Sequence, residues 1–300
     1  MSAELVERIA KLKTERGAVI LAHNYQLPEV QDIADFTGDS LELSRKAAAT
    51  DAGVIVFCGV HFMAETAKIL SPDKTVLIPD PEAGCPMADM ITAAELREFK
   101  AMHPGIPVVA YVNTSAEVKA ESTICCTSAN AVRVVESIDA DAVLFVPDKS
   151  LAAHVASKVT KKVIPYSGFC PTHHRIIARD VINVKREHPN AMVVAHPECA
   201  PDVLALADGI ESTSGMLKWV ANSNASEFIM CTERGLLHRL KADNPTKTFY
   251  NPSALNICPN MKKITLEKVL WSLEDMQFAV ELDPEIISKA RSAIEGMIAI

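Results

Sequence analysis

The sequence lacks an apolar run long enough to span a bilayer, and its first residues lack the uninterrupted apolar core of a signal peptide. We therefore expect a cytoplasmic protein, in which thiols stay reduced. The chain also has no excess of positive charge, since its formal net charge is −8 at pH 7. This balance argues against a nucleic-acid or anionic-membrane surface but still allows a local basic pocket for an anionic substrate.

Several common enzyme motifs are missing as well. No G-x-G-x-x-G follows a predicted strand and no G-x-x-x-x-G-K-[ST] loop is present, which argues against a Rossmann dehydrogenase and a P-loop enzyme. The chain has neither a G-x-S-x-G elbow nor an H-E-x-x-H motif. It does have eight cysteines. In a reducing compartment they suggest metal binding or chemistry for some and plain burial for the rest.

Three Cys-Pro pairs stand out among these cysteines. They are separated by 85 and 88 residues, too far apart for a local zinc knuckle: Cys85-Pro86, Cys170-Pro171 and Cys258-Pro259. Cysteines that hold iron–sulfur clusters are often followed by proline. We predict that the three thiolates converge and hold a [4Fe-4S] cluster, whose fourth iron stays open as a Lewis acid. The remaining cysteines at 58, 125, 126 and 231 are interpreted as buried and structural.

Other landmarks repeat in phase with these pairs. Apolar runs at residues 19–23, 108–111 and 193–196 end in His23, Tyr111 and His196, which are 88 and 85 residues apart. A second set of runs lies at residues 54–57, 142–145 and 227–230, with the same intervals. Between the two sets, a hydroxyl residue recurs at the same offset, as Ser40, Ser128 and Thr213. The chain therefore contains three copies of one unit.

The pattern of each unit predicts an α/β fold with parallel sheets. Short continuous apolar runs alternate with amphipathic helical patterns, such as 4–16, 94–102 and 176–187, which is typical of strands covered on both faces. We predict three similar three-layer α/β/α domains related by a pseudo-threefold axis, with the cluster and active site at their junction. Their expected bounds are residues 1–86 plus 261–300, 87–172 and 173–260. The tail reads as two helices separated near Asp283-Pro284 that pack on the first domain. A single barrel of nine βα units is the alternative.

Polar residues follow the first strand of each unit, where ligands gather in open α/β sheets. These candidate site residues are 23–25, 111–113 and 196–198. A single histidine at such a position is more often structural, but three equivalent polar clusters favour a shared active site. Ser40, Ser128 and Thr213 are expected as helix N-caps that together direct three positive helix ends toward an anionic substrate.

A zinc site offers a rival interpretation of one cluster. Cys199 lies beside His196 and Glu198, and these three residue types can bind zinc. Cys199 has no counterpart in the other two units, which disfavours this site. His173 and His174 follow Cys170 closely enough to border the predicted iron–sulfur cluster.

With these residues assembled, the chain resembles the quinolinate synthase (NadA) family, the iron–sulfur enzymes of de novo NAD biosynthesis. The resemblance covers nearly the whole chain. It rests on Leu21-Ala22-His23-Asn24-Tyr25-Gln26, Gly38-Asp39-Ser40, Cys85-Pro86-Met87-Ala88, Tyr111-Val112-Asn113, Thr127-Ser128-Ala129-Asn130, Cys170-Pro171-Thr172-His173, His196-Pro197-Glu198-Cys199, Ser212-Thr213 and Cys258-Pro259-Asn260-Met261-Lys262. Two positions depart from the family pattern, which has Gly where Glu211 stands and Gln where Gly215 stands.

The resemblance implies a reaction and a set of site residues. The reaction is condensation of iminoaspartate with dihydroxyacetone phosphate to quinolinate, with loss of phosphate and two waters. The iminoaspartate would come from an L-aspartate oxidase or dehydrogenase. A [4Fe-4S] cluster would be held by Cys85, Cys170 and Cys258. Tyr25, His196 and Glu198 are the implied catalytic residues. The implied substrate-binding residues are His23, Ser40, Tyr111, Val112, Asn113, Ser128, His196, Pro197, Glu198 and Thr213.

Two other functions fit the same residues. Another [4Fe-4S] hydro-lyase could use the open iron on a small carboxylic acid. A non-enzymatic carrier of a cluster or of zinc would need the cysteines but would tolerate alanine at His23, Tyr111 and Glu198.

Overall fold

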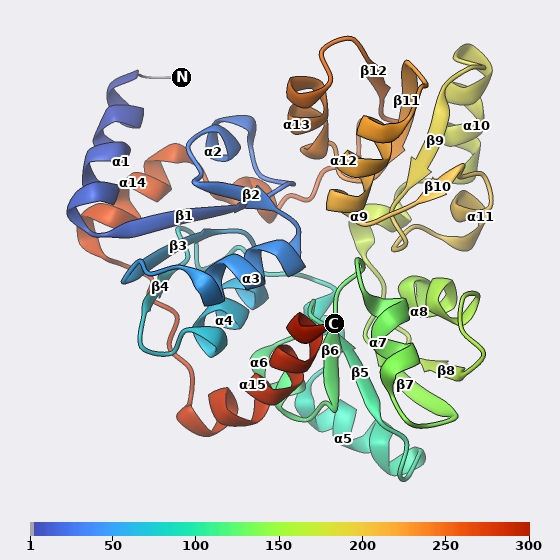
Figure 1. The fold of residues 1–300 in the computed structure, drawn as a ribbon, viewed down its shortest axis with the longest axis horizontal. Helices are drawn as coiled ribbons and strands as arrows, with labels where there is room; N and C mark the ends of the chain where they lie inside the picture. Colours follow the sequence, from blue (N-terminus) through green and yellow to red (C-terminus); the bar gives the residue numbers. More distant parts are fainter. Residues whose placement is uncertain (1–2) are drawn as a thin grey trace.

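The structure, a computed structural model, describes residues 3–300 and contains three separate four-stranded parallel sheets (Figure 1). The first has the order β2-β1-β3-β4, with strands Phe36–Gly38, Ala18–His23, Val54–Cys58 and Thr75–Leu77. The second has the order β6-β5-β7-β8, with strands Ile124–Cys126, Val108–Tyr111, Ala142–Val146 and Lys162–Pro165. The third has the order β10-β9-β11-β12, with strands Gly209–Ile210, Met192–Ala195, Glu227–Cys231 and Thr248–Tyr250. The α/β prediction is confirmed, and the single-barrel alternative is wrong.

The central pair of each sheet consists of the apolar runs seen in the sequence. β1 pairs with β3, β5 with β7 and β9 with β11. Their side chains are buried on both faces, as continuous apolar strands require when helices cover the sheet on both sides. The short edge strands β2, β6 and β10 lie outside these runs and were not predicted.

In each unit, helices alternate with the strands in the same order along the chain. In the first unit they are α1 (Ala3–Glu15), α2 (Pro28–Asp32), α3 (Ser40–Ala49) and α4 (His61–Leu70). In the second they are η1 (Ala88–Met90), α5 (Ala93–Met102), α6 (Ala116–Ala120), α7 (Ala131–Ser137) and α8 (Lys149–Ala156). In the third they are α9 (Pro171–His174), α10 (Ala178–Glu187), α11 (Pro201–Leu204), α12 (Thr213–Asn222) and α13 (Leu236–Asp243).

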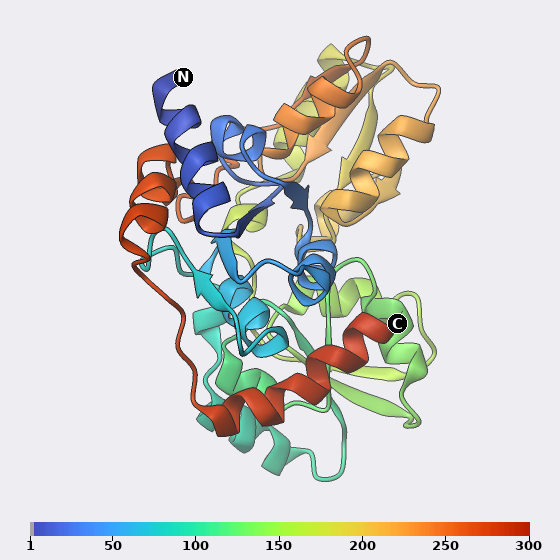
Figure 2. The ribbon, with the colours of Figure 1, turned by 60° about the vertical axis from the view of Figure 1, so that its left-hand side comes forward.

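The tail after the third unit contains η2 (Met261–Lys263), α14 (Leu266–Asp275) and α15 (Pro284–Ala299). The break falls at Asp283, whose carboxylate caps α15, and Pro284 follows as its first residue. α14 packs against α1, whereas α15 crosses to α6 and β6 of the second unit (Figure 2). The tail therefore connects the first and second units, and the domain bounds given above stay a prediction.

Two glycines lie shortly after helices in the left-handed conformation. Gly17 follows α1 with φ of 56° and Gly105 follows α5 with φ of 79°. A side chain at either position would be strained in this left-handed conformation. None of the helices within residues 3–300 is both long enough and apolar enough to cross a membrane.

Candidate active site

A buried pocket lies where the three units meet, at the carboxyl ends of the central strands. It encloses about 70 Å³ and takes lining residues from all three units. Among them are twelve of the fifteen predicted site residues: His23, Tyr25, Ser40, Cys85, Tyr111, Asn113, Ser128, Cys170, His196, Glu198, Thr213 and Cys258. The convergence follows from the repeat, because equivalent strand ends of three parallel sheets face one centre.

The three Cys-Pro thiols lie in this pocket in equivalent local structures. Each cysteine precedes one short helical turn, η1, α9 or η2. Backbone N–H groups at the start of that turn oppose the rise of the cysteine pKa: those of residues 87 and 88 at Cys85, of residue 173 at Cys170, and of residues 260 and 261 at Cys258. N–H groups close to a sulfur favour the thiolate, the form that binds metal. The proline at the first position suits this turn because it has no N–H to lose.

The donor set fits a metal cluster on electrostatic grounds. Burial raises the pKa of Cys85 to about 12, and the neighbouring Cys258 adds to this effect. Burial likewise raises the pKa of Cys170, with the charge of Cys85 adding to it. Three thiolates gathered in a buried pocket therefore need a positive centre to replace their protons, and a bound metal provides it.

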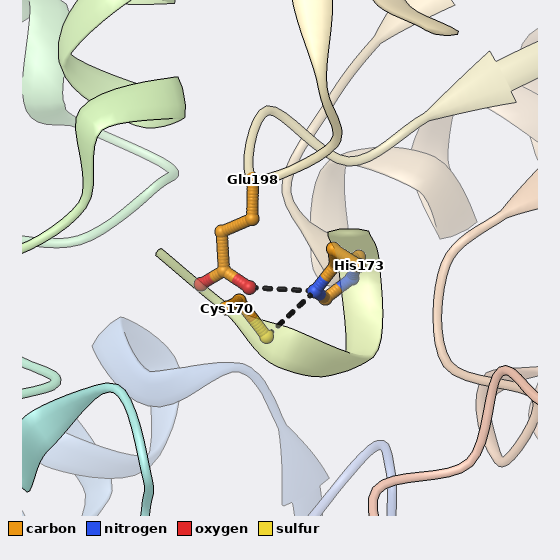
Figure 3. Close-up of side chains that lie close together, drawn as sticks. All are labelled: Cys170, His173 and Glu198. Atoms are coloured by element: carbon orange, nitrogen blue, oxygen red, sulfur yellow. Dashed lines mark hydrogen bonds and ion pairs between the residues drawn. The ribbon is translucent and has the colours of Figure 1, made fainter. Parts of the chain in front are cut away.

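One of these thiols, Cys170, forms a compact group with His173 and Glu198 (Figure 3). His173 Nδ1 lies 2.7 Å from Glu198 Oε2 and 3.2 Å from Cys170 Sγ. One ligand atom from each residue lies within 4.8 Å of the others. The group is compatible with metal binding, and it places the carboxylate directly next to a predicted cluster ligand.

Glu198 is the centre of a hydrogen-bond network that crosses between units. The Tyr111 hydroxyl of the second unit donates to its Oε1 at 2.6 Å. Burial alone would raise the pKa of Glu198. The neighbouring His173 and the hydrogen bonds from His173 and Tyr111 hold the pKa of Glu198 well below its usual range. Glu198 is therefore a buried carboxylate that stays ionised.

Tyr25 faces this network from the first unit. Its hydroxyl lies 2.6 Å from Thr232 Oγ1 and 3.4 Å from His173 Nε2. Burial, reinforced by the charge of Glu198, raises the pKa of Tyr25 well above its ordinary value. Tyr25 therefore keeps its proton at neutral pH, whereas Glu198 does not.

His23 and His196 occupy equivalent positions and have equivalent hydrogen bonds. His23 Nδ1 accepts from the backbone N–H of Tyr25 at 3.1 Å, and His196 Nδ1 accepts from that of Glu198 at 3.3 Å. Burial lowers the pKa of each to about 3. Both imidazoles are therefore neutral, and since Nδ1 accepts, the proton lies on Nε2, where it can be donated to a ligand.

Three predicted site residues do not line the pocket. Asn24 is buried beside it and is bonded to Thr213. Val112 is packed in a small hydrophobic space with Phe57 and Phe62. Pro197 lines a second, outer cavity. Val112 and Pro197 both neighbour residues that do line the pocket. They lie in the bend and the turn that follow β5 and β9, where successive side chains face different surroundings.

The predicted N-cap role of the hydroxyl residues is wrong at all three positions. Asp39 caps α3 and Ser212 caps α12, so that Ser40 and Thr213 are the first helical residues. α7 begins three residues after Ser128, behind Asn130. The hydroxyls are therefore free of capping and line the pocket. Asn24 of the first unit donates to Thr213 Oγ1 at 2.9 Å.

The alternative zinc site does not assemble in the described chain. Cys199 is buried in the core of the third unit, where its thiol donates to the backbone carbonyl of Cys231 at 3.2 Å. Glu198 is instead bonded to His173, which the sequence placed only at the border of the cluster. The cysteines at 58, 125, 126 and 231 are buried and free, as interpreted from the sequence.

One acidic pocket residue, and its counterpart in another unit, were missed from the sequence. Glu233, which lines the pocket, is fully buried and bonded to Lys262 at 3.0 Å, and its carboxylate accepts from the backbone N–H of Cys258. Its counterpart in the second unit is Asp148, 85 residues earlier. Burial, with the charge of Glu198, raises the pKa of Asp148 to about 8. Both residues follow the second central strand of their units. The sequence analysis considered only the residues after the first central strand, and extending it to the second would have found them.

The two departures from the family pattern compensate each other. A Cβ at Gly215 would lie 2.6 Å from Glu211 Oε2 and 3.1 Å from Glu211 Cβ. The Glu211 side chain therefore occupies the space that a side chain at position 215 would need.

Fold and pocket together define an α/β enzyme with a buried site compatible with metal binding. A family model described as quinolinate synthetase A protein matches residues 7–299. A quinolinate synthase of Dehalococcoides mccartyi is 60% identical over 301 residues, covering 100% of both chains. Quinolinate synthase 1 of Methanosarcina acetivorans is 57% identical over 298 residues, covering 99% of this chain and 98% of its own. The quinolinate synthase of Thermodesulfovibrio yellowstonii is 53% identical, covering 98% of each. The chain belongs to the quinolinate synthetase A family.

Proposed function

We propose that this protein condenses iminoaspartate with dihydroxyacetone phosphate to form quinolinate, releasing one phosphate and two waters. The iminoaspartate would be supplied by an L-aspartate oxidase or dehydrogenase. The observation that carries the proposal is one pocket containing three Cys-Pro thiols, a neutral histidine pair and an ionised glutamate beside a protonated tyrosine. The relatives' names support the same reaction.

Cys85, Cys170 and Cys258 would hold a [4Fe-4S] cluster. When bound, it would supply a Lewis acid for a substrate oxygen. The three thiols must stay reduced to bind it, so a reducing compartment such as the cytoplasm is part of the proposal. Glu233 supports this site because its carboxylate accepts the backbone N–H of Cys258 and so fixes the segment that carries the thiol.

The remaining residues divide the work of binding and proton transfer. His23 and His196 present Nε2–H groups, and Ser40, Ser128 and Thr213 present hydroxyls. These donors suit carboxylate and phosphate oxygens without adding net charge. Glu198 would accept a proton as general base, and Tyr25 would deliver one as general acid. Closing the ring and losing two waters needs both roles.

The test uses anaerobically purified protein and two matched cysteine variants. We expect quinolinate to form from the two substrates and about four irons and four sulfides to be bound per chain, the composition of a [4Fe-4S] cluster. Cys170→Ala should lose the brown chromophore and activity, whereas Cys199→Ala, whose thiol lies in the core, should keep both. A full cluster in Cys170→Ala would remove that ligand assignment. Turnover of a hydroxy acid without quinolinate formation would point to a hydro-lyase instead.

A further inference from the structure

We propose that a ring of three cations, Arg45, Arg133 and Lys218, surrounds the approach to the active site and draws anionic substrates toward it. The inference rests on the proposed function for the identity of those substrates. It adds an outer binding region that the buried pocket does not include.

The ring follows the internal repeat. Arg45 and Arg133 are 88 residues apart, and Arg133 and Lys218 are 85 apart. These are the intervals that relate Ser40, Ser128 and Thr213, and each cation lies five residues after one of those hydroxyls. Each unit therefore contributes one hydroxyl to the inner pocket and one cation farther along the same segment.

The three cations line one cavity. It encloses about 260 Å³ and lies among α3, α7 and α12, the helices that carry them. These helices come from three different units and lie around the middle of the view in Figure 1. All three cationic side chains are exposed. Asp39 and Ser128 line both this outer cavity and the buried pocket. The outer cavity therefore adjoins the active site and opens to solvent.

The cations are available to a ligand. Within residues 3–300, Arg133 forms no ion pair and no side-chain hydrogen bond. Arg45 donates to the backbone carbonyl of Ile298 at 2.9 Å, which leaves its charge uncompensated. Lys218 lies 3.9 Å from Glu42, and its side chain is 75% exposed, so this contact is weak.

Two of the three acidic groups that line the cavity, Asp39 and Glu42, have hydrogen-bond partners, and the third is Glu211. Asp39 accepts backbone bonds at the start of α3, and its Oδ2 accepts from Ser212. Glu42 accepts from the hydroxyl of Ser214 and completes the capping box of α3. Burial raises the pKa of Asp39 and of Glu211. A raised pKa favours the neutral acid, which does not repel an incoming anion. The remaining titratable side chain is His154, whose pKa burial lowers.

Both proposed substrates suit this region. One carries a phosphate and the other two carboxylates, so each arrives as a dianion. The protein as a whole repels them, with a formal net charge of −8. Positive charges clustered at a cleft attract an anionic substrate even when the whole protein is negative. Such clusters raise association rates by roughly 10- to 1,000-fold.

The experiment removes the charges while keeping the side chains polar. Variants are Arg133→Gln alone and the triple Arg45→Gln, Arg133→Gln, Lys218→Gln. The control is Arg179→Gln, an exposed cation of α10 whose side chain is 80% accessible and lines neither cavity. The measured quantities are kcat and kcat/KM for each substrate at several salt concentrations. Calorimetry with inorganic phosphate measures anion binding without turnover.

We expect the triple variant to lose about tenfold in kcat/KM at low salt for at least one substrate, with kcat within about twofold of wild type. The loss should vanish near molar salt, where the screening length falls to about 3 Å. Arg133→Gln should show a smaller loss of the same kind, and it tests the ring even if the triple variant folds poorly. Arg179→Gln should behave as wild type, and phosphate should bind more weakly to the triple variant.

Wild-type kcat/KM with an unchanged salt dependence in both ring variants would overturn the inference. So would a fall in kcat that salt does not affect, because that marks a structural effect. If wild-type protein makes no quinolinate but phosphate binding still weakens in the triple variant, the proposed function fails while the cation ring stands.

Discussion

Replacing Glu198 by Gln tests the chemical role of the pocket most directly. The substitution keeps the size and shape of the side chain but removes its charge. The amide oxygen of the variant can still accept the Tyr111 hydroxyl that Glu198 Oε1 accepts at 2.6 Å. The amide N–H₂ group would face His173 Nδ1, now 2.7 Å from the carboxylate, and a change of imidazole tautomer would restore that bond.

The expected effect on stability is small because two contributions oppose each other. Hydrogen bonds to a charged group are worth about 1.5–3 kcal/mol each, and two of them would be weakened. The buried carboxylate also carries a desolvation cost of several kcal/mol, which the neutral amide avoids. We therefore expect the free energy of unfolding to change by no more than about 2 kcal/mol.

The expected effect on rate is large because an amide cannot act as a base. Loss of a general acid–base group costs about 10²- to 10⁴-fold. At about 1.36 kcal/mol for each factor of ten, this corresponds to roughly 3–5.5 kcal/mol in the activation barrier. The variant should therefore fold and bind iron as wild type does, while kcat falls by a factor of about 100 or more.

The assay compares quinolinate formation, iron and sulfide content and thermal unfolding for wild type and two variants. The matched control is Glu65→Gln. Glu65 is another buried glutamate, on α4, that accepts the backbone N–H of Ala116 at 3.0 Å and lies outside the pocket. Near wild-type kcat in Glu198→Gln with full iron would remove Glu198 as the base. An equal loss in Glu65→Gln would show that the effect comes from neutralising any buried glutamate.

Three further predictions concern pH and capping. Tyr111→Phe removes a bond that holds the pKa of Glu198 low, so that pKa should rise and the acid limb of the pH–rate profile should move to higher pH; an unmoved limb refutes this. Burial lowers the pKa of His23 to about 3. The unfolded chain then binds a proton at His23 that the folded chain does not, so His23 alone lowers the free energy of unfolding by about 1.4 kcal/mol per pH unit as pH falls from about 6.5 toward 3. In urea unfolding, the free energy of unfolding of His23→Asn should therefore depend less on pH than that of the wild type. The same pH dependence in both proteins would exclude this contribution of His23. Asp39→Ala removes the cap of α3 and the acceptor for Ser212, and should cost about 1–2 kcal/mol in thermal unfolding. An unchanged Tm would contradict that estimate.

The central strands and the repeat could be read from the sequence because both depend on local patterns. Apolar runs such as 54–57 and 142–145 became β3 and β7 with at most one residue added. A short continuous apolar run bounded by turns favours a strand covered on both faces of a sheet. The edge strands were missed because two or three half-buried residues, such as Gly209–Ile210, carry no such pattern.

Cap positions were predicted less well because neighbouring polar residues compete for them. Asp39 and Ser40 both favour an N-cap, and so do Ser212 and Thr213. The structure places the cap one residue earlier at both helices. This choice depends on contacts from another unit, since the Ser212 hydroxyl also donates to Asp39. Pairing of this kind cannot be read from either segment alone.

The sequence by itself determined the three-unit repeat, the parallel sheets and which thiols are equivalent, because each depends on the order and spacing of residues along one segment. Only the tertiary structure decided the partners: that Glu198 is bonded to His173 and Tyr111, that Cys199 turns into the core, and that α15 crosses to the second unit. These contacts join side chains from segments far apart in the chain. Their distances, and the pKa shifts they cause, exist only once the units have packed together and excluded water.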